Sequence, residues 1–210
     1  MGYCATAFAV DIQKVKDVFG SKSSEMLDKA KKTNMYRLYV DQFKNGVYDR
    51  CIEDIIFKYV TPSERKESKK FFGLLNSVEG SGLNKSLGSE YGYALMAICE
   101  VLGTYLTPEG DIFPLGSFTE ETNEYLANKG FRITFNDLEQ PQQLFDIPAV
   151  QTWPVIHSFS HEEVRYLYDE LCKLNIDDDD EEYDAEILIH LRDKLKICIE
   201  KEVEWLSFVH

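Results

Sequence analysis

The sequence lacks the cysteine pattern of a secreted, disulfide-bonded protein and that of a zinc site. Its five cysteines, Cys4, Cys51, Cys99, Cys172 and Cys198, are scattered, and no two of them form a C-x-x-C pair. Disulfide frameworks usually show an even number of cysteines, and structural zinc sites show closely spaced pairs. We therefore expect free thiols, a reducing compartment and a cytoplasmic location.

Long apolar runs are also absent. No run approaches the roughly 20 apolar residues that a membrane-spanning helix needs, and the N-terminus lacks the basic start of a secretory signal. Residues 1–6 match the myristoylation pattern M-G-x-x-x-[ST], with Cys4 as a candidate for palmitoylation. The same residues continue into the apolar segment 7–10, which predicts a buried first strand. A strand needed in a sheet cannot also be a free lipid arm, so we expect no membrane partner.

Positive charge is in short supply. The 210 residues contain 37 acids and 23 bases, which gives a formal net charge of −14. Such a charge repels nucleic-acid phosphates and favours basic partners. We therefore expect no nucleic acid among the partners and consider a basic protein instead. The alternative is that the acidity serves only solubility.

Recognisable catalytic and cofactor motifs are missing as well. Residues 79–86 resemble a phosphate-binding loop, but Glu79 and Asn84 stand where that loop requires glycine. The acidic run 177–182 fits no EF-hand register, because neither a sixth-position glycine nor a twelfth-position glutamate follows. The four histidines form no H-E-x-x-H motif. We expect no cofactor, no metal and no catalytic residue, and the chain is more consistent with a non-enzyme.

The sequence does contain ample material for a core, because 44% of its residues are hydrophobic and 13% are aromatic. We expect one domain over residues 1–210 with an α+β fold that is mostly helical. The helix over 91–106 is apolar nearly all round, which predicts a central position. A small sheet should pair residues 3–10 with 205–209, and residues 131–135 or 152–158 could join it. The pattern Thr-Pro-Ser-Glu at 61–64 predicts the start of a further helix.

Several of these segments resemble a known family. They are the strand ending in Val10-Asp11, the helix beginning Tyr91-Gly-Tyr-Ala-Leu95, and the ending Phe208-Val-His210. The chain resembles an uncharacterised bacterial protein family known only as a domain of unknown function. The shared residues are mostly of core type, so the resemblance implies a fold and a bacterial cytosolic protein, and it supplies no reaction.

Two sets of residues are candidates for function. The first is a partner-binding set made of Trp153, an aromatic residue beside a proline, and the acidic run Asp177, Asp178, Asp179, Asp180, Glu181 and Glu182. Such a run can face a basic partner or can simply be a solvated connection. The second set is a polar stripe on the apolar helix, formed by Tyr93, Glu100 and Thr104. It is either a solvent-facing edge or the lining of a pocket, where burial would raise the pKa of Glu100.

These observations support three functional hypotheses. The first is a non-catalytic protein-binding module, similar to an immunity protein or an antitoxin, that binds a basic partner. The second is a small enzyme or ligand sensor with a pocket near Glu100. The third is an oligomeric scaffold protein, although the sequence does not specify an oligomeric state.

Overall fold

A computed structural model describes residues 3–65, 67–68, 77–78, 80–107, 114–116, 119–150, 152–174, 176 and 185–210. Contacts within the chain define two compact units. Unit 1 comprises residues 1–12, 103–144 and 153–210, and unit 2 comprises residues 13–102 and 145–152. Each unit is assembled from stretches that lie far apart in the sequence. The expectation of one domain over residues 1–210 stays a prediction beside this division.

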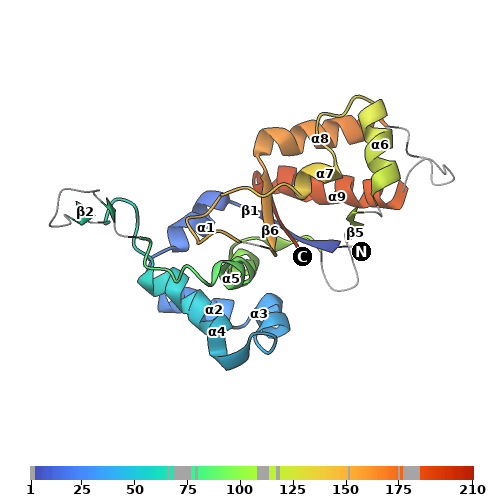
Figure 1. The fold of residues 1–210 in the computed structure, drawn as a ribbon. Helices are drawn as coiled ribbons and strands as arrows, with labels where there is room; N and C mark the ends of the chain where they lie inside the picture. Colours follow the sequence, from blue (N-terminus) through green and yellow to red (C-terminus); the bar gives the residue numbers. More distant parts are fainter. Residues whose placement is uncertain are drawn as a thin grey trace. The chain divides into compact units, whose positions relative to one another are not determined.

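Unit 1 contains an antiparallel sheet in which four strands follow one another (Figure 1). Their order is β4 (Thr104–Tyr105), β1 (Tyr3–Val10), β7 (Glu204–Val209) and β6 (Val155–Phe159). A further short strand, β5 (Pro114–Leu115), pairs with the beginning of β1. Strands β1 and β7 pair from Ala5 opposite Val209 to Val10 opposite Glu204. The predicted α+β class and the pairing of residues 3–10 with 205–209 are therefore confirmed.

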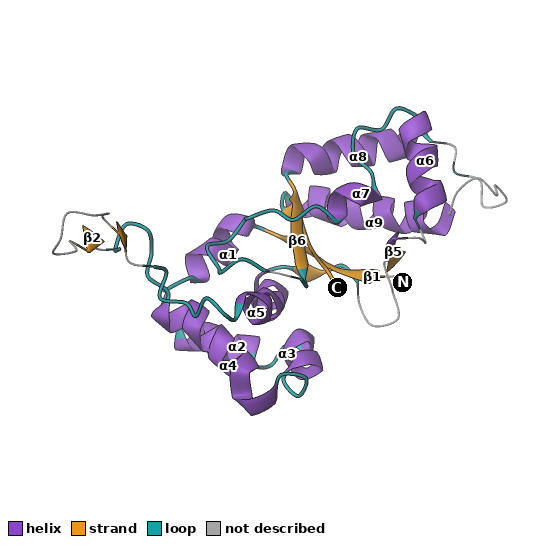
Figure 2. Cartoon of the chain, in the orientation of Figure 1, coloured by secondary structure: helices purple, strands orange, loops and turns teal. Residues whose placement is uncertain are grey.

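The helices of unit 1 share a hydrophobic core with one face of this sheet. They are α6 (Glu120–Asn128), α7 (Phe135–Leu138), α8 (His161–Lys173) and α9 (Ala185–Lys201) (Figure 2). Successive side chains of a strand point to opposite faces, so Ala5, Ala7 and Ala9 of β1 share one face, and all three belong to this core. Small alanine side chains let a helix approach the sheet closely, and α9 packs against β1.

The α8–α9 pair follows the sequence pattern closely. Ser160 caps α8, and its side chain accepts a hydrogen bond from the amide of Glu163 while the Glu163 side chain bonds back to Ser160. This is the capping box that the sequence predicts. Leu167 and Leu171 of α8 are buried with Leu188 and Leu195 of α9, and the two helices pack side by side.

In the residues that the structure describes, the elements of unit 2 are helical apart from one short two-stranded sheet. Its helices are α1 (Ile12–Val18), α2 (Ser24–Ala30), α3 (Asn34–Tyr39), the 3-10 turn η1 (Lys44–Gly46), α4 (Val47–Glu53), the π-helical turn η2 (Asp54–Lys58) and α5 (Gly88–Leu102). The first residue of α1 belongs to unit 1. In α5 the residues from Ala94 to Cys99 are all buried. Helix α5 packs against α2, α3 and α4, which agrees with its apolar character on several sides.

The apolar helix ends four residues before the predicted end at Leu106, and Thr104 and Tyr105 form strand β4 instead. Gly103 explains the change. A Cβ at this position would lie 2.5 Å from the backbone oxygen of Ala9 and 2.8 Å from Cβ of Val10. The chain therefore passes so close to β1 that only glycine fits, and the next residues pair with β1 rather than continue the helix.

Two further expectations about elements are wrong. Residues 131–135 alternate like a strand, yet Phe135 begins α7, because Thr134 and Asp137 form a capping box that starts a helix. The helix expected after Thr61 is limited to a turn in the described residues. Glu64 does bond to Thr61, but Glu67–Ser68 form strand β2, which pairs with β3 (Ser77–Val78). The Gly- and Ser-rich segment before α5 is irregular over residues 80–87.

Candidate functional site

Glu100 reaches from α5 to the beginning of α3. Its two carboxylate oxygens accept hydrogen bonds from the backbone amides of Asn34, at 3.1 Å, and Met35, at 2.8 Å. The Thr33 side chain accepts the next amide, that of Tyr36, at 3.1 Å. The first amides of a helix have no partner inside the helix, and negative charge is favourable there. The Glu100 carboxylate thus caps the N-terminus of α3, and its place in a ligand pocket stays a prediction.

The other two members of the predicted polar stripe lie in different surroundings. Tyr93 packs in an aromatic cluster, with ring centroids 4.8 Å from Tyr39 and 5.4 Å from Phe43, and its carbonyl oxygen accepts a hydrogen bond from the Tyr48 hydroxyl. Thr104 belongs to unit 1, where it stands opposite Ala9 in the sheet. Because α5 ends before Thr104, the three residues do not form one helical stripe.

Trp153 lies in unit 1, and the residue is 37% exposed. Its ring packs on Tyr3, with the two centroids 5.1 Å apart. The acidic run 177–182, the other part of the predicted partner-binding set, lies outside the described residues. The helices on either side of the run are described, because α8 ends at Lys173 and α9 begins at Ala185.

The negative charge of the protein is concentrated in unit 1. The sequence of unit 1 contains 24 acidic and 8 basic residues, a formal charge of −16, whereas unit 2 contains 13 acidic and 15 basic residues, a charge of +2. The excess of acids over the whole chain therefore arises entirely from unit 1. Negative electrostatic potential that is concentrated on one unit attracts a cationic partner to that unit. Negative charge spread evenly over the protein would favour neither unit.

Helices α8 and α9 contribute exposed carboxylates to this charge. Glu162 and Asp169 of α8 are exposed and lie seven residues apart, and the same spacing separates the exposed Glu186 and Asp193 of α9. Two residues seven apart lie on one face of a helix. We call these four side chains the acidic face of α8 and α9. Arg165, which is also exposed, lies between Glu162 and Asp169 in the sequence, whereas Lys173 forms an ion pair of 2.6 Å with Glu170.

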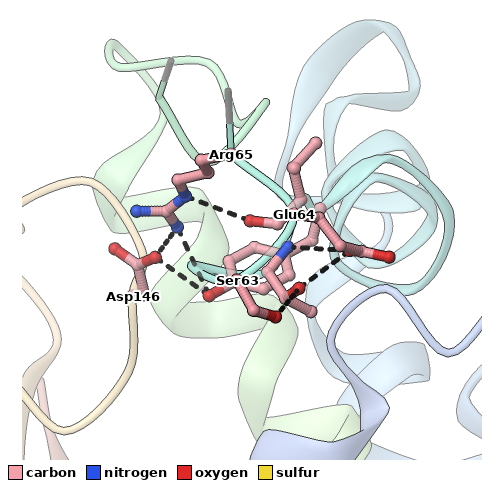
Figure 3. A network of polar contacts seen from close by, with 7 residues as sticks. Ser63, Glu64, Arg65 and Asp146 are labelled. Carbon is pink, nitrogen blue, oxygen red and sulfur yellow. Dashed lines mark hydrogen bonds and ion pairs between the residues drawn. The ribbon is translucent and has the colours of Figure 1, made fainter. Parts of the chain in front are cut away.

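A polar network in unit 2 was not predicted from the sequence. Arg65, whose side chain is 15% exposed, forms an ion pair with Asp146 and donates a hydrogen bond to the carbonyl oxygen of Val60 (Figure 3). The Tyr59 hydroxyl donates to Asp146 at 2.9 Å, and the Arg65 guanidinium lies 5.8 Å from the centroid of the Tyr59 ring. Arg65 and Asp146 are 81 positions apart, so no local sequence pattern predicts their contact. The network fastens segment 145–152 to the rest of unit 2.

The sequence patterns also give no indication of a buried carboxylate near this network. Asp54, at the start of the π-helical turn, is only 5% exposed. It forms an ion pair of 2.7 Å with Lys58 and accepts a hydrogen bond of 3.0 Å from the Tyr91 hydroxyl. The same hydroxyl accepts the amide of Asn84 at 3.1 Å. Burial raises the pKa of Tyr91, which keeps its hydroxyl protonated. Asp54 and Tyr91 thus hold the irregular segment 80–87 in place.

Three of the cysteines in the described residues are in surroundings that make them poor nucleophiles. Cys51, Cys99 and Cys198 are buried, and burial raises the pKa of each thiol, to about 12 for Cys51 and Cys198. Buried thiols of this kind are inert. Within the part of the chain that the structure describes, no group of three or more His, Cys, Asp or Glu side chains could hold a metal ion.

Unit 1 has an apolar cavity among α6, α7, α8 and α9. Its lining includes Leu126, Phe131, Leu138 and Leu191, and among the described residues of the wall only Thr134 is polar. The cavity leaves room for only about one water molecule. A ligand site normally offers several hundred Å³ and a few convergent polar groups. This cavity is therefore a packing defect of the core rather than a substrate site.

Comparison with known proteins identifies a family for this chain. A family model described as "Domain of unknown function (DUF7691)" matches residues 74–208. The match includes α5 and most of unit 1, but it begins after β1 and α1–α4. Neither the curated proteins nor the solved structures contain a significant match. In the described residues, no helix is long and apolar enough to cross a membrane.

Proposed function

The chain belongs to the DUF7691 family, a domain of unknown function, and we propose that it acts as a non-catalytic protein-binding module for a basic protein partner in the cytoplasm. The observation that carries this proposal is the division of charge, −16 in unit 1 against +2 in unit 2. A partner with a cationic surface would dock on unit 1 through charge complementarity, in the manner of an immunity protein or an antitoxin.

The acidic face of α8 and α9 is the described part of the proposed binding surface. The acidic run 177–182 joins these two helices in sequence and would extend the surface. Trp153, in the same unit, would supply an aromatic contact, because exposed aromatic residues are enriched in protein interfaces. Charge complementarity would speed the encounter and make it sensitive to salt, since surface charges are screened beyond about 10 Å at 0.1 M salt.

The test uses the full chain as bait in an extract of its native cell, followed by affinity measurements with the recovered partner. We expect a stoichiometric basic protein whose affinity falls as salt rises. Neutralising the acidic face with Glu162→Gln, Asp169→Asn, Glu186→Gln and Asp193→Asn should weaken binding about tenfold or more. Trp153→Ala should weaken it further.

A matched control changes the net charge equally but in the other unit. It carries Asp17→Asn, Glu25→Gln, Asp28→Asn and Asp41→Asn, all at exposed positions of unit 2. If this variant loses as much affinity as the first, the partner senses only net charge, and the proposed surface is wrong. If no stoichiometric partner is recovered at low salt, the proposal itself loses its support.

A further inference from the structure

Gln142 covers the outer edge of strand β6. Its backbone amide donates to the carbonyl oxygen of Ile156 at 2.9 Å. Its side-chain oxygen Oε1 accepts hydrogen bonds from the amide and the hydroxyl of Ser158, each at 3.0 Å. Strand β6 is the last strand in the order of the sheet, with β7 on its other side. One residue therefore occupies two of the backbone hydrogen-bonding positions that a further strand would use, which hinders the edge from pairing with another chain.

The same glutamine meets a buried histidine. His157 is 5% exposed, and its Nδ1 lies 2.9 Å from the carbonyl oxygen of Gln140. Its Nε2 lies 3.5 Å from the side-chain nitrogen of Gln142. The loop residues Gln140 and Gln142 thus contact both nitrogens of the His157 ring. We call residues 140–142 the strap.

These contacts fix which ring nitrogen carries the proton. The amide of Ser158 can only donate, so the group that faces it must be Oε1 of Gln142, and the NH2 group of Gln142 must then face His157. The carbonyl oxygen of Gln140 can only accept, so Nδ1 of His157 carries the hydrogen. Nε2 is therefore the bare nitrogen of a neutral imidazole.

A second proton on His157 conflicts with the closed strap. It would sit on Nε2 and point at the NH2 group of Gln142, which cannot accept a hydrogen bond. Turning the glutamine amide would relieve this contact, but it would then aim the NH2 group at the amide of Ser158. The protonated ring and the closed strap therefore compete.

The charged groups around His157 do not remove this conflict. Asp137 on α7 and Glu163 on α8 favour the protonated ring, and so does the bond to Gln140, but burial outweighs them and lowers the pKa of His157. Neighbouring strand β7 contributes the neutral Ser207, whose hydroxyl donates to the carbonyl oxygen of His157. Asp137 is itself bonded to Thr134, and Glu163 to Ser160.

We propose that the strap is a proton-controlled latch on the edge of β6, which neutral His157 holds closed and protonated His157 releases. Release frees the carbonyl oxygen of Ile156 and the amide of Ser158. These are the groups through which an extended segment of another chain would join the sheet. The latch would thus make the pairing of this edge depend on acidity.

The first test is hydrogen exchange and NMR on the full chain. At about pH 7.5 the His157 ring should be the tautomer protonated at Nδ1, and the Ser158 amide should be protected. As the pH falls to about 5, Ser158 protection, corrected for the intrinsic exchange rate, should drop about tenfold relative to Leu106. The Leu106 amide is the reference because it bonds to Ala7 in the same sheet at 2.8 Å.

The second test removes the effect of pH on the strap. In Gln142→Glu a carboxylate can accept from Ser158 and from protonated His157 at once, so the pKa of His157 should rise and the Ser158 amide should stay protected at about pH 5. The control variant Gln143→Glu adds the same charge at the adjacent exposed position. In this variant the Ser158 amide should lose protection at low pH nearly as much as it does in the wild type.

Three outcomes would overturn the latch. They are a His157 ring protonated at Nε2 in the wild type, Ser158 protection that does not change with pH, and equal effects of the two charge-adding variants. The wild-type measurements remain decisive even if a variant fails to fold.

Discussion

A single carboxylate on α5 shows how much of a residue's role depends on a distant partner. Glu100 stands out in the sequence because its neighbours on the helix are apolar. Its partners, the amides of Asn34 and Met35, are 66 and 65 positions away. The sequence therefore identifies the unusual residue, but the fold determines that it caps a helix.

The cap predicts a measurable loss of stability. Glu100→Ala leaves the first amides of α3 without their acceptor, so the free energy of unfolding should fall by about 1–2 kcal/mol. Glu100→Gln keeps one acceptor oxygen and should cost less. The control is Asp28→Ala, which removes an exposed carboxylate from the same unit. Urea denaturation measures all three variants, and an equal effect of Glu100→Ala and the control would argue against the cap.

At the scale of elements, the junction between α5 and β4 depends on Gly103. The neighbouring atoms are backbone and Cβ atoms of β1, which cannot rotate away from an added methyl group. Gly103→Ala should therefore destabilise the protein by about 1–3 kcal/mol through overpacking. Gly80→Ala is the matched control, because a Cβ there meets nothing within 4 Å and its backbone needs no left-handed conformation. Thermal unfolding distinguishes the two, and similar midpoints would contradict the steric explanation.

The elements that the sequence predicts well are those with strong local periodicity or capping. Helix α8 has both, and strands β1 and β7 are short apolar runs. The strand predicted over residues 131–135 is wrong because the alternating pattern there is short. The capping box of Thr134 and Asp137 starts helix α7 at Phe135 instead. The Arg65–Asp146 network and the strap on β6 join residues that are distant in the chain or use backbone groups. Patterns of residue types carry no signal for such contacts.

At the scale of the whole molecule, charge and family membership point to different parts of the chain. The acidic excess is a property of unit 1, and it becomes visible only when the boundaries of the units are known. The family match covers most of unit 1 but begins after β1, whose alanines form part of the core of that unit. The family-defining segment therefore completes its sheet with an N-terminal strand from outside the match.

Acid sensitivity should also arise in unit 1, because all four histidines lie there and unit 2 has none. Burial lowers the pKa of both His157 and His210 below the ordinary value of 6.5. When the pH falls below about 6.5, these two histidines take up protons more readily in the unfolded chain than in the folded chain, which favours unfolding. The contribution of these histidines is therefore fully present above about pH 6.5 and is lost as the pH falls through their folded pKa values.

The measurement is the free energy of unfolding in urea between about pH 7.5 and 5, a range that avoids most carboxylate titration. The double variant His157→Gln, His210→Gln should lose less stability over this range than the wild type, whatever its stability at neutral pH. The control variant His190→Gln removes a histidine from the same unit at a half-exposed side chain. Protonation of the many acids relieves self-repulsion and acts in the opposite direction, but it affects every variant equally. Parallel slopes for the wild type and the double variant would show that the buried histidines do not exclude protons in the folded state.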